Sequence, residues 1–238
     1  PKHLLEGKDL HAPEFGRDPV GTGPYRFKRW MTMDRIEVEA FDRYFEGRPS
    51  IDRYIFRVIP DQASLFLALL TGALDQIDLT PLQYVRETDS RKFQSEYAAF
   101  RYPSLGYTYL GFNLQSPKFC DVRVRHAIDL AISKEEIIDG ILLGLARQTS
   151  GPFALTSWAY NPQVLPAGFR PDKARALLEE AGWRDIDKDG IREKDGEKFE
   201  FTLITNQGNE NRKMAAEIIQ QRLAEVGISM KVRIVEWS

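Results

Sequence analysis

Cysteine is almost absent from the sequence, with Cys120 alone among 238 residues. A single cysteine excludes an intrachain disulfide and a cysteine-ligated metal cluster. No apolar run approaches the roughly 20 residues that a membrane-spanning helix needs. Neither sign of charge dominates, because 33 Lys and Arg residues stand against 35 Asp and Glu residues, and the basic ones are scattered. A nucleic-acid groove needs clustered basic side chains, so we expect no nucleic-acid partner.

Residue patterns that indicate catalysis are also missing. The histidines His3, His11 and His126 form no HExxH or similar metal-binding pair. No G-x-S-x-G sequence marks a nucleophile, and the GTGP near the start lacks the rest of a dinucleotide-binding motif. Asp75 and Asp78 are close in sequence, but that spacing does not establish the separation that glycoside hydrolysis requires. We therefore expect a protein that is not an enzyme and that has no cofactor.

Strand-like and helix-like stretches alternate along the chain, which is typical of an α/β fold. Alternating apolar residues predict a hairpin with its turn at residues 31–34. Further strands are predicted over 51–59, 74–79, 97–113, 199–204 and 230–237. Helices are predicted after the capping residues Asp61, Asp121 and Ser133, after Pro171, and over 211–226.

The 3.6-residue period of apolar side chains predicts which face of three helices packs inward. In the first the inward residues are Ala63, Phe66, Leu67 and Leu70. In the second they are Val124, Ala127, Ile128 and Ala131. In the last they are Ala215, Ile219, Leu223 and Val226.

A long irregular stretch covers residues 146–169 and is rich in proline, glycine and aromatic residues. Loops of this length inside a compact domain are often functional. Tyrosine and tryptophan present a large apolar face with one polar group, which suits the wall of a ligand site. We predict ligand contacts from Trp158 and Tyr160 in this stretch and from Tyr107 and Tyr109 before it. Packing in the core is the alternative role for each of them.

The aspartate loop, DIDKDGIREKDG at residues 185–196, has the first half of an EF-hand calcium loop. Asp185, Asp187 and Asp189 stand at ligand positions 1, 3 and 5, with glycine at position 6. The second half departs from the motif, because position 12 is Gly196 and a strand is predicted to follow. We interpret the loop as a connection whose aspartates bond nearby backbone amides. Calcium binding by the three aspartates is the alternative.

Five further stretches, in this order along the chain, carry a resemblance to a known family. They are PVGTGPYRFKRW, RYFEGRPSIDRYIFRVIPDQASLFLALLTGALDQIDL, YLGFNLQSPKFCDVRVRHAIDLAISKEEII, RPDKARALLEEAGW and MAAEIIQQRLAEVGISMKVRIVEW. Together with the aspartate loop they resemble the family 5 extracellular solute-binding proteins of ABC transporters, the dipeptide, oligopeptide and nickel group. The resemblance covers nearly the whole chain.

The resemblance implies a periplasmic-binding-protein-like α/β fold of type II, with two mixed-sheet lobes that hinge strands join. Residues 1–96 would be the returning part of lobe one, and residues 97–238 would be lobe two. The hinge strands would lie at about 97–106 and 232–237, where few dihedral angles absorb closure. Other parts of lobe one would be missing, so we expect a fragment. Its exposed apolar surface would favour self-association.

The implied function is capture of a peptide between the lobes and its delivery to the membrane permease of an ABC importer. The implied location is periplasmic or extracellular, with a lipid anchor to the cell membrane as one form. Relatives in the family bind nickel chelates, sugars, haem or opines, so a non-peptide ligand is an alternative. A calcium-dependent structural module is a further alternative.

The resemblance also implies a site for the amino terminus of a peptide. In the oligopeptide-binding relatives, an aspartate just before the last helix of lobe two pairs with that amino terminus, because an unpaired buried ammonium is costly. Alignment places Asn209 at this position and Glu210 next to it. Glu210 in the cleft would favour peptides with a free amino end, whereas Asn209 would favour uncharged ligands. Helix capping by Asn209 is the third alternative.

Overall fold

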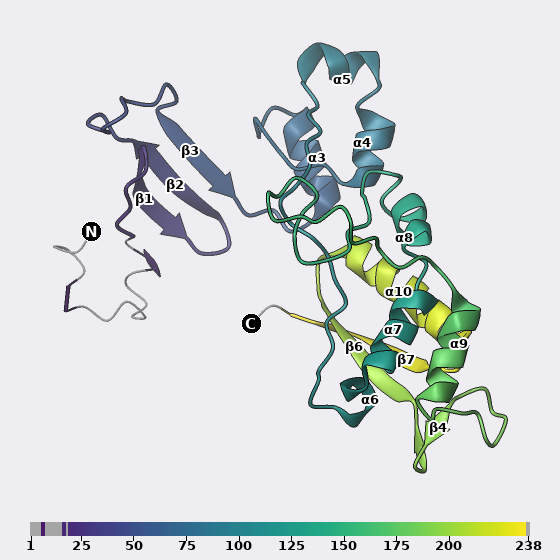
Figure 1. The fold of residues 1–238 in the computed structure, drawn as a ribbon. Coiled ribbons are helices and arrows are strands. Elements are labelled where there is room, and N and C mark those ends of the chain that lie inside the picture. Colours follow the sequence, from purple (N-terminus) through teal and green to yellow (C-terminus); the bar gives the residue numbers. More distant parts are fainter. Residues whose placement is uncertain (1–5, 8–15, 18, 237–238) are drawn as a thin grey trace. The chain divides into compact units, whose positions relative to one another are not determined.

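The structure is a computed structural model that describes residues 6–7, 16–17 and 19–236 of the chain (Figure 1). Three residues of the predictions above lie outside the described residues: His3, His11 and Trp237.

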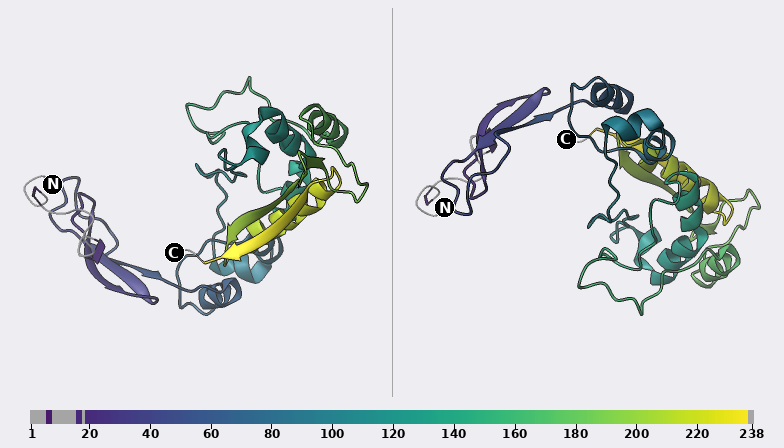
Figure 2. Two further views of the ribbon diagram at one scale, coloured as in Figure 1. Left: turned by 90° about the horizontal axis from the view of Figure 1, so that it is seen from below. Right: turned by 90° about the horizontal axis from the view of Figure 1, so that it is seen from above.

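The chain forms two compact units, Pro1–Ile77 and Asp78–Ser238. Figure 2 shows the chain coloured along its sequence, with the first unit in purple and blue and the second from blue-green to yellow. The predicted lobe boundary at residue 96 falls inside the second unit. The units and the predicted lobes thus divide the chain at different places, and the lobe boundary stays a prediction.

The first unit contains a three-stranded antiparallel sheet in the order β1-β2-β3. Its strands are β1 (Tyr25–Met31), β2 (Arg35–Ala40) and β3 (Arg53–Arg57). The predicted hairpin is confirmed, because Met31 pairs with Arg35 across the turn. The strand predicted over 51–59 is confirmed in its central part.

A buried carboxylate lies in the middle of this sheet. Glu37 of β2 is only 2% exposed and forms ion pairs with Arg29 at 2.6 Å and Arg35 at 2.8 Å. A hydrogen bond from the Arg29 guanidinium, helped by the charge of Arg35, holds the pKa of Glu37 below its ordinary value despite its burial. The charge is therefore paired where it is shielded from water.

The helix α3 (Gln62–Leu70) starts and stops as its local sequence predicts. The Asp61 carboxylate accepts the Ser64 amide hydrogen bond at 2.7 Å, and Gly72 follows the helix with φ of +71°. Its buried face differs from the prediction, since Leu69 is buried and Phe66 half-buried. Three predicted core residues are exposed: Ala63, Leu67 and Leu70. The apolar side chains of this helix point to all of its sides, so their period does not select one face.

Residues 74–79 form no strand, so that prediction is wrong. A strand exists only as part of a ladder, and no described segment pairs with these residues.

Two short helices, α4 (Pro81–Glu87) and α5 (Arg91–Glu96), open the second unit and were not predicted. Local capping holds both of them. Thr80 and Gln83 form a reciprocal capping box, and the Ser90 hydroxyl accepts a hydrogen bond from the Phe93 amide. The sequence carried this signal as a threonine, a proline and a glutamine at positions 80, 81 and 83.

The strand predicted over 97–113 is also wrong, because the structure assigns no strand to this segment. The first predicted hinge strand, 97–106, is therefore not a strand here. Pro103 lacks a backbone N–H, and no described segment pairs with this stretch. The second hinge strand overlaps β7 (Ser229–Val235), which is formed.

Helices and a parallel strand pair form the core of the second unit. The strands β6 (Glu200–Asn206) and β7 pair in parallel from Glu200 opposite Ser229 to Asn206 opposite Val235. The helices are α6 (Pro117–Cys120), α7 (Val122–Ala131), α8 (Lys134–Gly140), α9 (Pro171–Glu180) and α10 (Glu210–Ala224). Figure 1 shows α7, α9 and α10 gathered beside β6 and β7.

The predicted inward face of α7 is confirmed, because all four of its residues are buried: Val124, Ala127, Ile128 and Ala131. In α10 and the turn after it, Leu223 and Val226 are buried and Ile219 packs against the core, as predicted. Ala215 is only half-buried, and its neighbour Ala216 is buried instead. Residues 146–169 contain no helix or strand, as predicted.

Candidate functional site

The predicted ligand residues of the irregular stretch lie at the surface. Trp158 is 98% exposed, and Tyr160 is half-buried. Trp158 therefore packs into no core among the described residues. A tryptophan that folding leaves this exposed has nearly all of its ring available to a ligand or partner.

Tyr107 and Tyr109 form a small aromatic pair before α6. Their ring centroids are 5.5 Å apart, and the two side chains are 44% and 74% exposed. The structure thus brings together two of the four predicted aromatic residues. Among the described residues, no ring contact joins this pair to Trp158 or Tyr160. Their role in ligand binding stays a prediction.

Asn209 is the N-cap of α10, because its side-chain oxygen accepts a hydrogen bond from the Arg212 amide at 2.9 Å. The helix-capping alternative is thus confirmed for this residue. Glu210 begins the helix, is exposed, and has a carboxylate oxygen 3.7 Å from the Lys213 ammonium. A carboxylate in the first turn is favourable to the helix dipole. Whether either residue also contacts a ligand remains a prediction.

The three aspartates of the aspartate loop each accept a backbone hydrogen bond from within the loop. Asp185 accepts from the Gly190 amide at 3.1 Å, and Asp187 from the Asp189 amide at 3.1 Å. Asp189 accepts from the Ile191 amide at 2.9 Å. The loop is therefore a well-formed connection, as predicted. It leads into a hairpin of β4 (Glu193–Lys194) and β5 (Glu197–Lys198).

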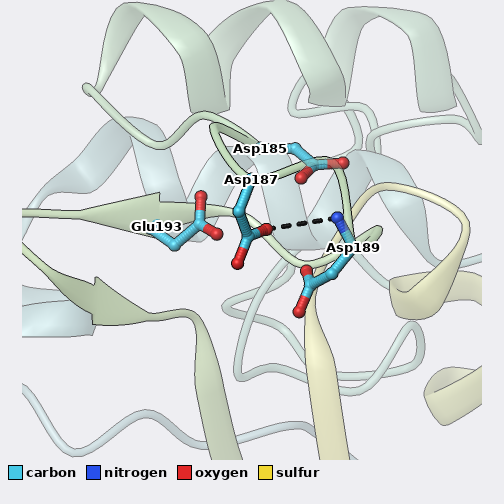
Figure 3. Close-up of side chains that lie close together, drawn as sticks. All are labelled: Asp185, Asp187, Asp189 and Glu193. Atoms are coloured by element: carbon cyan, nitrogen blue, oxygen red, sulfur yellow. Dashed lines mark hydrogen bonds between the residues drawn. The ribbon is translucent and has the colours of Figure 1, made fainter.

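A fourth carboxylate, Glu193, joins the three aspartates. One oxygen from each of Asp185, Asp187, Asp189 and Glu193 lies within 4.8 Å of the others. Figure 3 shows these four side chains close together. Sequence reasoning missed Glu193. The available signal was its place at position 9 of the loop, which is a ligand position in an EF-hand. These oxygen donors are the type that hard divalent cations prefer.

Lys198 supplies a positive charge to this cluster. Its ammonium is 3.4 Å from a carboxylate oxygen of Asp187 and forms a shorter ion pair with Asp189. Hydrogen bonding to Lys198 holds the pKa of Asp189 below its ordinary value, and the same bond raises the pKa of Lys198. One lysine neutralises one of the four carboxylates.

A shallow cavity of about 320 Å³ lies between the aspartate loop and the end of α10. Its lining includes Asp185, Gly190, Arg192 and Glu225. None of the predicted ligand aromatics belongs to this lining. In the described part of the chain, no helix combines the length and the apolar character that crossing a bilayer requires.

Comparison with known proteins identifies the fold. The chain is 36% identical to the solved structure of AppA from Bacillus subtilis in complex with a nonapeptide, with a TM-score of 0.87. That match covers 100% of this chain and 47% of the AppA chain. NikZ of Campylobacter jejuni in complex with Ni(L-His) is 30% identical, with a TM-score of 0.85. That match covers 99% of this chain and 47% of the NikZ chain.

Sequence relatives agree with the solved structures. The oligopeptide-binding protein AppA of Bacillus subtilis is 37% identical over 246 residues, which cover 100% of this chain and 44% of AppA. The dipeptide-binding protein of Escherichia coli is 29% identical, with 92% of this chain and 39% of the relative covered. The chain thus spans less than half the length of these relatives.

The fold is the mixed α/β fold of periplasmic binding proteins, and the class is that of solute-binding proteins. Residues 2–238 match the family described as bacterial extracellular solute-binding proteins, family 5 Middle. The chain belongs to this family, which confirms the resemblance found in the sequence. Membership in a solute-binding family agrees with the expectation of a binding role rather than a catalytic one.

Proposed function

We propose that this chain is part of the substrate-binding component of an ABC importer and that its ligand is a peptide. The relationship to AppA carries the proposal, because it extends over the whole chain at 37% identity and the related structure holds a nonapeptide. The protein works outside the cytoplasm, in the periplasm or at the cell surface with a lipid anchor. The family's description as extracellular supports that location.

Capture requires two lobes that close on the peptide, with residues 1–96 in the first and 97–238 in the second. The peptide shifts the equilibrium toward the closed form, and the permease receives that form. The free energy of closure changes by the difference between the peptide's binding free energies for the two forms. Exposed aromatic side chains such as Trp158 and Tyr109 support such a role, because they gain buried area only when a ligand covers them.

A non-peptide ligand is the second candidate. NikZ, which is 30% identical to this chain over nearly all its length, was solved with Ni(L-His). Asn209 also favours this candidate, because it offers no charge to a peptide amino terminus and already caps α10. Native mass spectrometry of the protein, purified from its source without denaturation, distinguishes the candidates by the mass of the ligand it carries.

Acetylation of the peptide's amino terminus tests the role of Glu210. We expect the native protein to bind an N-acetylated peptide at least about tenfold more weakly than its free twin, because a charge pair is lost. Calorimetry measures both affinities. Glu210→Gln should abolish most of this difference, whereas Glu217→Gln, an exposed glutamate farther along α10, should preserve it. Equal affinity for the two peptides would rule out pairing with the amino terminus while leaving peptide binding intact.

Trp158→Ala separates a ligand contact from a structural role. Because the side chain is 98% exposed, we expect the free energy of unfolding to change by less than about 0.5 kcal/mol. Loss of an aromatic contact should weaken peptide binding by about tenfold or more. Leu165→Ala, in the same irregular stretch and also exposed, should change neither quantity. Unchanged peptide affinity in the Trp158 variant would remove this residue from the site.

A further inference from the structure

Glu193 is the unusual member of the carboxylate cluster. It is 9% exposed, whereas the three aspartates are exposed. Its Oε2 accepts a hydrogen bond from the Ile186 amide at 2.8 Å, but its buried Oε1 has no hydrogen-bond partner within the described structure. Figure 3 shows this side chain pointing toward Asp187. A buried carboxylate oxygen without a donor is costly, and a bound cation would remove that cost.

The spacing of the oxygens suits one ion. Calcium binds oxygen ligands at 2.3–2.6 Å, so two ligands on opposite sides of the ion stand about 4.8 Å apart. The four carboxylate oxygens here lie within 4.8 Å of one another. Magnesium demands shorter bonds and a stricter octahedron, and zinc prefers nitrogen and sulfur ligands. We propose that Asp185, Asp187, Asp189 and Glu193 form a binding site for a divalent cation of the calcium type.

Glu193 also compensates for the missing glutamate by which the loop departs from an EF-hand. The motif places a bidentate glutamate at position 12, which is Gly196 in this chain. The hairpin of β4 and β5 begins at Glu193 instead and directs that carboxylate back to the three aspartates. The cation would thus join the start of the loop to the start of the hairpin.

Lys198 competes with the cation. Its ammonium pairs with Asp187 and Asp189, two of the four proposed ligands, and a cation must displace it. Removing this ammonium should therefore tighten cation binding. In a loop that only needs lysine as its counter-ion, the same change would create no binding.

Calorimetry with CaCl₂ tests the site in the whole chain after treatment with EDTA. We expect saturable binding with a dissociation constant on the order of 0.1–1 mM, weaker binding of MgCl₂, and a higher melting temperature with calcium. Glu193→Gln and Asp187→Asn should each weaken calcium binding at least about tenfold. Asp195→Asn, in the same hairpin but outside the cluster, should have no effect. Lys198→Gln should bind calcium more tightly than the unaltered chain.

Terbium luminescence gives a second readout. Trp183 lies two residues before Asp185, so a terbium ion in the site should emit when tryptophan is excited. Added calcium should remove this emission because it displaces terbium from the site. The proposal is overturned if a folded chain, verified by circular dichroism, shows no saturable binding up to about 10 mM calcium. It is also overturned if Asp195→Asn weakens binding as much as Glu193→Gln, or if Lys198→Gln fails to strengthen it.

Discussion

Replacing Phe199 with alanine is expected to lower the free energy of unfolding of the second unit by about 3–5 kcal/mol. The side chain is completely buried in the hydrophobic core of this unit. Its ring centroid is 4.4 Å from that of Trp183, 6.3 Å from Phe119 and 6.2 Å from Phe201. Alanine would leave a cavity that three rigid neighbouring rings cannot fill, so the loss in free energy of unfolding should be near the upper end of this range.

Urea unfolding followed by circular dichroism measures this change. Phe100→Ala is the matched control, because Phe100 lies in the same unit and is 80% exposed. Its removal should change the free energy of unfolding by less than about 0.5 kcal/mol. If Phe199→Ala were as mild as this control, the aromatic cluster would not be the centre of the core.

Arg192→Met should be the second most damaging change, with an expected loss of roughly 2–4 kcal/mol. Arg192 is 7% exposed and donates hydrogen bonds to the carbonyl oxygens of Val226 at 2.8 Å and Trp183 at 2.9 Å. Methionine keeps the length of the side chain but provides no donor, so both carbonyl groups lose this partner. The ion pair with Glu179 contributes little, because that carboxylate is largely exposed.

Arg175→Met is the control for Arg192, because Arg175 also donates to a backbone carbonyl, that of Glu225, but from an exposed position. We expect its removal to cost less than about 1 kcal/mol. Gly227 gives an independent check on the packing. A Cβ at Gly227 would meet the Cγ of Arg192 at 2.8 Å, and its φ of +85° favours glycine, so Gly227→Ala should also destabilise the unit. Equal losses in Arg192→Met and Arg175→Met would contradict the central position of Arg192.

Local sequence determined the elements whose hydrogen bonds and apolar faces are local. Asp121 caps α7, and four residues at helical spacing face the core, because α7 has polar residues on its other side. The hairpin of β1 and β2 likewise formed where alternation and a short turn placed it. The order of motifs along the chain was sufficient to identify the family, which the comparisons confirm.

Elements whose partners lie far along the chain could not be placed in this way. The stretch 97–113 has strand-forming residues but no described partner, and the apolar helix α3 has no polar side to define its buried face. Ser133 accepts the Glu136 amide hydrogen bond as a capping box requires. The Glu136 carboxylate, however, pairs with Arg222, 86 residues away, at 2.7 and 2.9 Å.

The same distinction between local and distant partners applies to the candidate sites. Sequence placed the three aspartates together, because they share one short loop, and it placed Trp158 in an irregular stretch. Only the tertiary structure showed that Trp158 is exposed, that Asn209 caps α10, and that Glu193 is buried beside the aspartates. Burial depends on which distant segments cover a side chain, and a carboxylate becomes a candidate ligand here because the hairpin turns it toward the loop and shields it from water.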